Sequence, residues 1–229
     1  MKIQFIQHSA ADRPAVAAEI ALELGHQCET IRVNRETPPP DSVEADVLML
    51  FGGAISFTKG VPHPPWVQQE QELIRQYVNK NRRVLGICLG SQMIATALGA
   101  SVRRNEQPEV GFHQVRQVEQ ASEMVAGVFP REFTTFHWHQ DTFGIPDGAV
   151  RVFESDACAN QGFSIDDRVF GFQFHLEADE KTVRAFVAVS SLLEKQGPHV
   201  QSESSILQGV GHLQSQRGIF ERFLRRFLA

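Results

Sequence analysis

The sequence predicts an α/β fold in which a mostly parallel β-sheet is covered by helices on both faces. Over the first 100 residues, short apolar segments alternate with segments of helical periodicity. The apolar segments are hydrophobic throughout, as is typical of parallel strands buried on both faces. The chain has 229 residues, 42% of them hydrophobic and 21% charged, so it can bury a large core in one main domain.

The first 100 residues divide into strand-like and helix-like segments in alternation. Strands are expected at 2–8, 28–33, 46–53 and 83–88. Helices are expected at 13–26, 64–81 and 92–100. Pro14 suits the first turn of the first helix, and Gly25 can end it. The segment between the second and third strands, "NRETPPPDSVEA", is expected to be a loop.

After residue 100 the pattern changes to short strands, several of them antiparallel. These strands are expected at 101–104, 112–118, 134–140, 150–155, 158–165 and 168–175. A helix is expected at 177–197, where Gly197 and Pro198 end it. We therefore expect one domain over 1–196.

Residues 197–229 are expected to add a polar connector and a C-terminal helix. Residues 199–212 are polar and rich in Gln and Ser, which is typical of a mobile connector. In the last helix, Phe220, Phe223, Leu224 and Phe227 form one apolar stripe. We expect this stripe to pack on the domain; a partner-binding face is the alternative.

Charge, apolar runs and cysteines narrow the class of protein. A net charge of −5 argues against a nucleic-acid partner. Apolar runs are too short for a membrane helix, and "MKIQFIQHSAADRP" breaks too early for a signal peptide. Three widely spaced cysteines, Cys28, Cys88 and Cys158, fit reduced thiols, so a cytoplasmic location is expected.

The segment "GICLGSQ" (86–92) places a cysteine between two glycines, after a strand and before a helix. Glycine, any residue, nucleophile, any residue, glycine in that context is the pattern of a nucleophile elbow. Gly86 and Gly90 keep Cβ atoms out of the tight turn, and the helix N-terminus favours the thiolate of Cys88. The alternative is a structural cysteine in a glycine-rich turn, and the motif alone does not choose between them.

Two further segments favour the nucleophile. "GFQFHLE" (171–177) ends an expected strand, and its alternation places His175 and Glu177 on one side. A carboxylate beside an imidazole orients the ring and stabilises its protonated form, although a surface His and Glu at a strand end is the alternative. In "LFGGAIS" (50–56), Gly52 and Gly53 leave backbone N–H groups unblocked, which could form an oxyanion hole with the N–H of Leu89.

These three segments together resemble the class I glutamine amidotransferase family, including the glutaminase domain of GMP synthase. The resemblance covers about residues 1–190 and extends to "EVGFHQV" and "FHWHQDTF". It implies a flavodoxin-like, three-layer α/β/α sandwich with a mostly parallel central sheet and a small antiparallel extension. It also implies that Cys88 attacks the side-chain amide of glutamine to form a γ-glutamyl thioester. His175, oriented by Glu177, would carry the proton.

The same resemblance implies the remaining site residues. Gly53 and Leu89 would hold the oxyanion, and the residues expected to meet substrate are Gly52, Gln92, Trp138, His139 and Gln140. Two positions depart from the family pattern. Leu176 replaces the usual proline, which leaves His175 less restricted. Gln140 replaces a glycine common among relatives, and its longer side chain can reshape the pocket.

Other candidate sites are weaker. His137, His139 and Asp141 alternate in "HWHQD" and could face one side of a strand as metal ligands. The resemblance places this segment beside the substrate pocket instead, so neither a metal nor a cofactor is expected. His8 is expected to be structural, and Cys28 and Cys158 inert.

The expected function is glutamine hydrolysis with release of ammonia and glutamate. Alternatives are hydrolysis of γ-glutamyl peptides or γ-glutamyl amines, a general cysteine protease, and a catalytically silent binding or regulatory module. No phosphate-binding loop of the form G-x-x-x-x-G-K-[ST] is present. The expected partners are therefore a small-molecule substrate and, if the ammonia is used, an acceptor or synthetase subunit in trans. A homodimer is left open.

Overall fold

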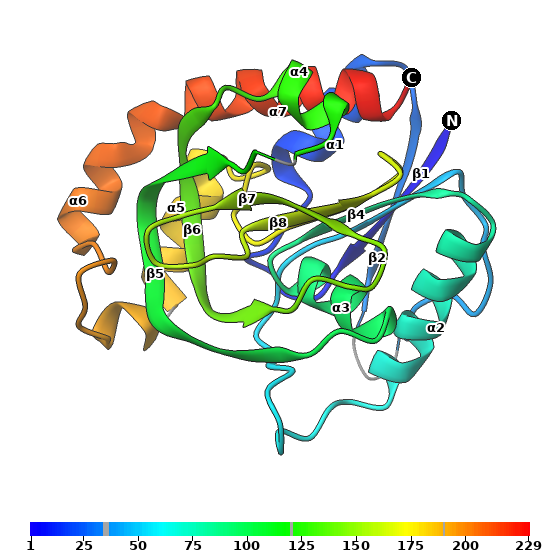
Figure 1. Ribbon diagram of the computed structural model, residues 1–229, viewed down its shortest axis with the longest axis horizontal. Coiled ribbons are helices and arrows are strands. Elements are labelled where there is room, and N and C mark those ends of the chain that lie inside the picture. The colour runs from blue at the N-terminus through cyan, green and yellow to red at the C-terminus, as the bar shows by residue number, and fades with distance from the viewer. Residues whose placement is uncertain (34–36, 120, 190) are drawn as a thin grey trace.

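The computed structural model describes residues 1–33, 37–119, 121–189 and 191–229 (Figure 1). The start of the expected loop at 34–36 and residue 190 of the expected helix lie outside this range. The described residues form one nine-stranded sheet in the order β2-β1-β3-β4-β9-β8-β7-β5-β6. The strands are β1 Lys2–Gln7, β2 Gln27–Arg32, β3 Val47–Leu50, β4 Arg83–Ile87, β5 Val102–Gln117, β6 Glu132–Phe143, β7 Val150–Glu154, β8 Gly162–Ile165 and β9 Val169–Phe172.

The sheet has a parallel part and an antiparallel part. Strands β2, β1, β3, β4 and β9 pair in parallel. Strands β8, β7, β5 and β6 continue the sheet by antiparallel pairing. The predicted α/β fold class is confirmed, with an antiparallel part that is as extensive as the parallel one.

Helices cover the parallel part on both faces. The α-helices are α1 Ala15–Glu23, α2 Trp66–Asn79, α3 Leu89–Ala97, α4 Glu123–Val128, α5 Glu180–Val189, α6 Glu203–Gln208 and α7 Leu213–Phe227. Alternate strand residues divide between two cores, because successive side chains point to opposite faces. Ile3 and Phe5 pack in one core with α1 and α7, whereas Ile6 packs in the other with α2 and α3.

The elbow helix α3 begins at Leu89, immediately after Cys88, rather than at residue 92 as expected. The turn at Cys88 is sharp enough that no linking residues beyond Cys88 itself separate β4 from α3. "LGS" therefore belongs to the first helical turn, although glycine and serine in a sequence favour a loop.

The region 101–118, expected as two short strands, is the single long strand β5. Its pairing with β6 shifts register between Arg104 and Glu109, where charged residues and Pro108 interrupt the apolar pattern. Such a bulge bends a strand without ending it. The β5–β6 hairpin consequently curves beside the parallel sheet (Figure 1).

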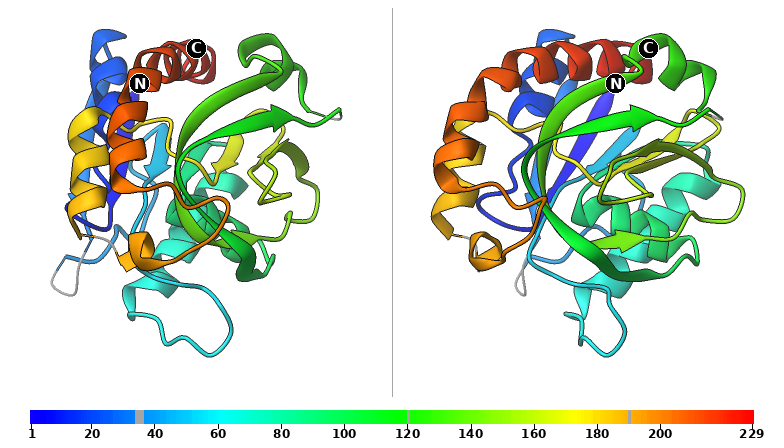
Figure 2. Two further views of the ribbon diagram at one scale, coloured as in Figure 1. Left: turned by 90° about the vertical axis from the view of Figure 1, so that its left-hand side faces the viewer. Right: turned by 60° about the vertical axis from the view of Figure 1, so that its left-hand side comes forward.

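The segment after α5 contains helices instead of a connector. The expected helix over 177–197 is the shorter α5, followed by the 3₁₀ helix η1, Ser191–Glu194. Residues expected as a connector form α6 and the 3₁₀ helix η2, Gly209–His212. Isolated apolar residues, such as the fully buried Ile206, pack against β5 and β6 together with α5. Both views of Figure 2 show α5 and α6 side by side.

The final helix α7 covers the sheet with its apolar stripe. Phe220, Phe223, Leu224 and Phe227 are each at most 1% exposed. Phe223 meets the rings of Phe170 and Phe172 on β9 at centroid distances of 5.1 and 5.2 Å. None of the described helices has the length and apolar character needed to cross a bilayer.

Candidate functional site

Cys88 occupies a strained turn at the carboxyl end of β4. Its backbone has φ 51° and ψ −109°, a region that residues with a Cβ rarely adopt. A Cβ on Gly86 would lie 2.5 Å from the backbone of Gly90, and one on Gly90 would lie 2.2 Å from the Leu50 carbonyl oxygen. The two glycines are therefore required by close backbone contacts, as the elbow motif predicts.

His175 and Glu177 form a buried pair next to this turn. His175 Nδ1 lies 2.8 Å from Glu177 Oε1, and both side chains are 0% exposed. The two residues follow the end of β9 at Phe172, so the strand alternation expected for them is wrong. A turn after the strand brings them together instead.

The charge of this pair depends on its neighbours. Burial opposes protonation of His175, but Glu177 and Cys88 together raise its pKa well above the ordinary 6.5. Because Nδ1 faces Glu177, Nε2 is left for the thiol side, and it has no hydrogen-bond partner among the described residues. A cysteine thiolate beside a histidine imidazolium is a recognised form of activated nucleophile.

A cavity of about 410 Å³ opens above the thiol. Of the residues predicted to form the site, those lining it are Gly53, Cys88, Leu89, Gln92, Trp138, His139 and Gln140. Gly52, His175 and Glu177 do not line it. A Cβ on Gly52 would lie 1.8 Å from Asp12 Oδ1 and 3.3 Å from His175 Cε1. The absence of a side chain at Gly52 therefore allows Asp12 and His175 to lie close to its backbone.

Two backbone N–H groups at the cavity are available to a ligand. In the described part of the chain, neither Gly53 N nor Leu89 N donates a backbone hydrogen bond. Leu89 is the first residue of α3, whose N-terminal N–H groups lack intrahelical acceptors. Both residues line the cavity together with Cys88.

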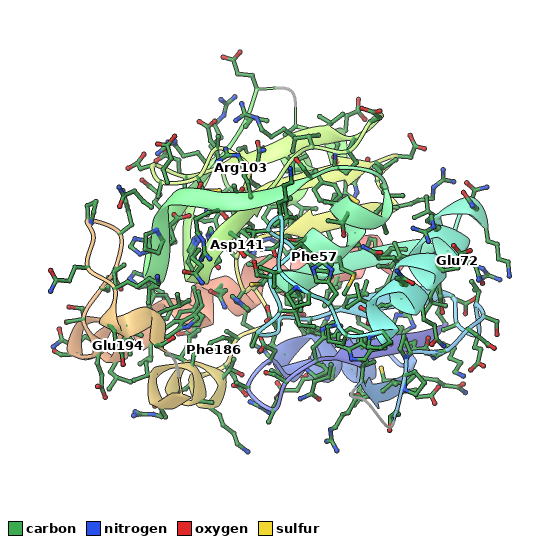
Figure 3. The ribbon with its side chains drawn as sticks, turned by 90° about the horizontal axis from the view of Figure 1, so that it is seen from below. Phe57, Glu72, Arg103, Asp141, Phe186 and Glu194 are labelled. Carbon is green, nitrogen blue, oxygen red and sulfur yellow. The ribbon has the colours of Figure 1, made fainter. Side chains whose placement is uncertain are left out.

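Several cavity residues could not be located from the sequence. Ser9 and Asp12 come from the loop after β1, Ser56 from the loop after β3, and Phe186 from α5. Ser56 ends the segment "LFGGAIS" but has no role predicted there, and the other three lie in no motif, so only the packing of distant segments brings them to the cavity. Figure 3 shows Phe186 on its helix below Asp141 of β6.

The lining of the cavity is acidic. Among the described residues that line it, Asp12 and Asp141 supply carboxylates, whereas no lysine or arginine contributes. Asp141 Oδ2 accepts a hydrogen bond from Ser56 at 2.6 Å, and Oδ1 lies 3.3 Å from Nε of Arg104. Arg104 therefore compensates part of the negative charge that the two carboxylates bring to the cavity.

Both ring nitrogens of His139 have partners within the protein. Its Nε2 lies 3.0 Å from Glu109 Oε2, and its Nδ1 lies 3.1 Å from the Asp141 carbonyl oxygen. Glu109 also accepts hydrogen bonds from Ser155 and Gln161. This network fixes the backbone of β6 that forms the cavity wall, and only the "EVG" segment within the family resemblance pointed to Glu109.

Glu109, His137 and His139 form the one group of described residues whose ligand atoms, all within 4.8 Å, could hold a metal ion. Asp141, which the sequence pattern offered as a possible third ligand, is not a member. Burial lowers the pKa of His137 to about 3, so this ring is neutral at pH 7. Burial disfavours the charge of Glu109, but His137 and His139 hold the pKa of its carboxyl well below its usual range. Two imidazoles and a carboxylate suit Zn²⁺, although protein donors already engage both Glu109 oxygens.

Comparisons with known proteins agree with this geometry. Residues 16–193 match the family model for glutamine amidotransferase class-I. The glutamine amidotransferase-like protein YfeJ of Salmonella typhimurium is 32% identical over 203 residues, which are 86% of this chain and 85% of that protein. One subunit of the glutamine-hydrolysing GMP synthase of Thermoplasma acidophilum is 33% identical over 140 residues, or 58% of this chain and 64% of that protein.

A solved structure of a glutamine amidotransferase has the same fold as this chain. A glutamine amido transferase from Methylobacillus flagellatus superposes with a TM-score of 0.89 at 28% identity, over 99% of this chain and 94% of that one. The fold and the strained cysteine turn thus define an α/β protein with an elbow at the carboxyl ends of parallel strands. Within that class, the chain belongs to the class I glutamine amidotransferase family.

Proposed function

We propose that this protein hydrolyses the side-chain amide of glutamine through a covalent thioester on Cys88. The observation that carries the proposal is the buried pair of His175 and Glu177 beside a strained cysteine that opens into a cavity. A thiol, a base and an orienting carboxylate are the parts that acyl transfer requires.

The reaction begins with attack of the Cys88 thiolate on the amide carbonyl carbon. The resulting oxyanion accepts hydrogen bonds from the N–H groups of Gly53 and Leu89. Protonated His175 then donates its proton to the nitrogen, the C–N bond breaks, and ammonia leaves a γ-glutamyl thioester. Water attacks the thioester while His175 accepts its proton, and glutamate is released as the thiol is restored.

Larger γ-glutamyl amides are the second candidate substrates. The supporting observation is that the cavity continues past Cys88 to Gln140 and to Phe186 of α5. The chemistry is the same, and only the leaving amine differs. Free glutamine remains the first candidate because Gln92 lines the cavity at the end of the elbow motif.

An acceptor subunit in trans is a further part of the proposal. The Thermoplasma acidophilum relative is one subunit of a glutamine-hydrolysing synthase, and that role would extend to this chain if its ammonia is used by a partner. A stand-alone hydrolase would instead turn over its substrate without a partner.

A substrate panel with intact mass measurement tests the proposal. Wild-type protein, Cys88→Ala and Cys158→Ala are given glutamine, a γ-glutamyl peptide and a γ-glutamyl amine. We expect turnover and a γ-glutamyl adduct with the wild type and Cys158→Ala, and loss of both with Cys88→Ala by several orders of magnitude. Cys158 is the matched control, because burial raises the pKa of its thiol to about 11.

Each of the other outcomes of this substrate panel would favour a different function. Cleavage of the γ-glutamyl amine or peptide with negligible glutamine turnover would favour the second candidate. No adduct and no turnover of any compound by the wild type would favour a catalytically silent module, and cleavage of unrelated peptides a general protease.

A further inference from the structure

A second buried histidine–carboxylate pair lies against residues 51–53, which we call the oxyanion loop. His8 follows β1 directly, and Glu70 lies on α2. His8 Nε2 is 2.9 Å from Glu70 Oε1, and the side chains are 1% and 0% exposed. Trp66, one turn earlier on α2, stacks on the imidazole at a centroid distance of 5.6 Å. A buried carboxylate on a helix facing a sheet is costly unless it is paired, so this pair requires a reason.

The hydrogen bonds of His8 define its protonation. Nδ1 lies 2.9 Å from the carbonyl oxygen of Phe51 and 3.2 Å from that of Gly52. Carbonyl oxygens only accept, so Nδ1 must carry a hydrogen. Nε2 faces a carboxylate, which favours a hydrogen there as well. From these contacts we assign a hydrogen to both ring nitrogens, which makes His8 an imidazolium.

The electrostatic environment agrees with this assignment. Burial lowers the pKa of His8, but the charge and hydrogen bond of Glu70 and the two carbonyls more than compensate and raise it above the ordinary 6.5. Glu70 is the ionisable group whose charge acts on His8 from α2. The segment 51–53 faces the ring with its carbonyl groups.

The contact with Gly52 determines the direction of a neighbouring N–H group. The carbonyl oxygen of Gly52 and the N–H of Gly53 belong to one planar peptide group. In a trans peptide these two bonds point in opposite directions, and no cis peptide occurs among the described residues. Holding the Gly52 oxygen at His8 therefore directs the Gly53 N–H away from His8, and Gly53 lines the cavity beside Leu89.

Close packing leaves little room for another arrangement. A Cβ on Gly53 would lie 2.9 Å from His8 Cβ and 2.7 Å from Leu89 Cδ2. The oxyanion loop is thus pressed between the histidine and the first residue of α3. A change in the His8 side chain would reach the Gly53 peptide without passing through the cavity.

We propose that His8 and Glu70 are positioning residues, which orient the Gly52–Gly53 peptide so that the Gly53 N–H serves as one donor of the oxyanion hole. The inference rests on the role of Gly53 in the proposed function. Donation from a charged imidazolium also polarises the peptide, which strengthens its N–H as a donor. Neither residue lines the cavity.

Kinetics of four variants test the proposal. His8→Asn keeps a donor close to the position of Nδ1, His8→Leu removes it, and Glu70→Gln removes the buried negative charge. Glu72→Gln, an exposed position on the same helix, is the control. Because the negative charge develops on the oxygen during attack and is absent from the bound substrate, we expect kcat to fall with KM changed less than about threefold.

The expected order of kcat separates positioning from simple stability. His8→Leu should lose on the order of 10²-fold, the cost of one oxyanion donor, and Glu70→Gln roughly 10-fold. His8→Asn should recover most of the loss, and Glu72→Gln should match the wild type. Equal kcat loss in His8→Asn and His8→Leu, or loss that follows only the folded fraction, would overturn the proposal.

Nuclear magnetic resonance gives a readout that does not depend on turnover. Both ring nitrogens of His8 should be protonated at pH 7 in the wild type, and Nε2 should lose its proton first in Glu70→Gln. The Gly53 amide resonance should stay in place in His8→Asn and move in His8→Leu. An unprotonated Nδ1, or an unmoved Gly53 resonance in His8→Leu, would refute the inference even if the wild type cleaves glutamine. Inactive wild-type protein with the expected spectra would refute only the proposed function.

Discussion

Single residues in the site have separable tasks, and Glu177 is the clearest example. Its carboxylate reaches one nitrogen of His175 and has no contact with the cavity. It is also one of the two groups that raise the pKa of His175 against the effect of burial. Its contribution should therefore be orientation and charge rather than proton transfer.

The substitution Glu177→Gln should lower kcat/KM less than His175→Ala. Glutamine can still accept the Nδ1–H hydrogen bond, whereas alanine removes the group that carries the proton; that loss is expected to reach on the order of 10⁴-fold or more. The pKa of His175 should fall in Glu177→Gln, because burial is then opposed only by Cys88. Steady-state kinetics and a ring titration of His175 measure both effects, and an equal loss in two well-folded variants would contradict this division of roles.

At the scale of elements, the elbow depends on how closely β4, α3 and β3 approach. Gly90, in the first turn of α3, lies against the carbonyl group of Leu50 at the end of β3. The contact involves backbone on both sides, so it cannot be relieved by a side-chain rotation. At this point α3 and β3 are so close that position 90 has room for the hydrogen atom of glycine but not for a Cβ.

The substitution Gly90→Ala should therefore destabilise the protein and displace Cys88. The added Cβ would lie 2.2 Å from the Leu50 carbonyl oxygen, and overpacking of this kind costs roughly 1–3 kcal/mol. Gly211→Ala is a matched control, since nothing lies within 4 Å of its Cβ position. Urea unfolding and the rate of Cys88 alkylation provide the measurements. Unchanged stability and alkylation in Gly90→Ala would show that the strand and helix can separate freely.

At the scale of the whole molecule, buried histidines of two kinds set the pH dependence of stability. Burial lowers the pKa of His137 to about 3, against 6.5 for an ordinary histidine. His8 and His175 have raised pKa values. Between pH 6.5 and 5 the unfolded chain gains a proton at His137 that the folded chain does not, so stability falls with acidity. Above pH 6.5 the folded chain keeps protons on His8 and His175 that the unfolded chain loses, so stability falls with alkalinity.

We therefore expect the free energy of unfolding to be greatest near pH 6.5. On the acid side, His137 contributes a slope of about 1.4 kcal/mol per pH unit, because each unit of pKa difference has that value. Burial also lowers the pKa of His113, so His137→Gln should reduce the acid-side slope without removing it, whereas the exposed His63→Gln should leave it unchanged. Urea unfolding at pH 5, 6 and 7 measures the slope. A wild-type stability that rises toward pH 5 would contradict the expected sign.

Much of the candidate site could be predicted because the residues expected to carry its chemistry lie in short segments of the sequence. The elbow "GICLGSQ" and the pair in "FHLE" each hold their residues within seven positions, so local geometry brings them together. The strand alternation expected for His175 and Glu177 is wrong, since they lie in a turn after β9. Their contact survives because two residues separated by one can meet in a turn as well as across alternate strand positions.

The strand and helix order of the first 100 residues followed from sequence by itself, since buried parallel strands and amphipathic helices have distinct periodicities. Tertiary structure alone decided what faces Cys88 and what supports its oxyanion loop. Asp12, Glu70 and Glu109 lie in three different segments, and no periodic pattern marks them. The free-energy cost of burying Glu70 and Glu109 is offset by His8 and His139, which lie far from them in the sequence. These contacts form only when the helices pack on the sheet and the strands pair, so the sequence alone does not reveal them.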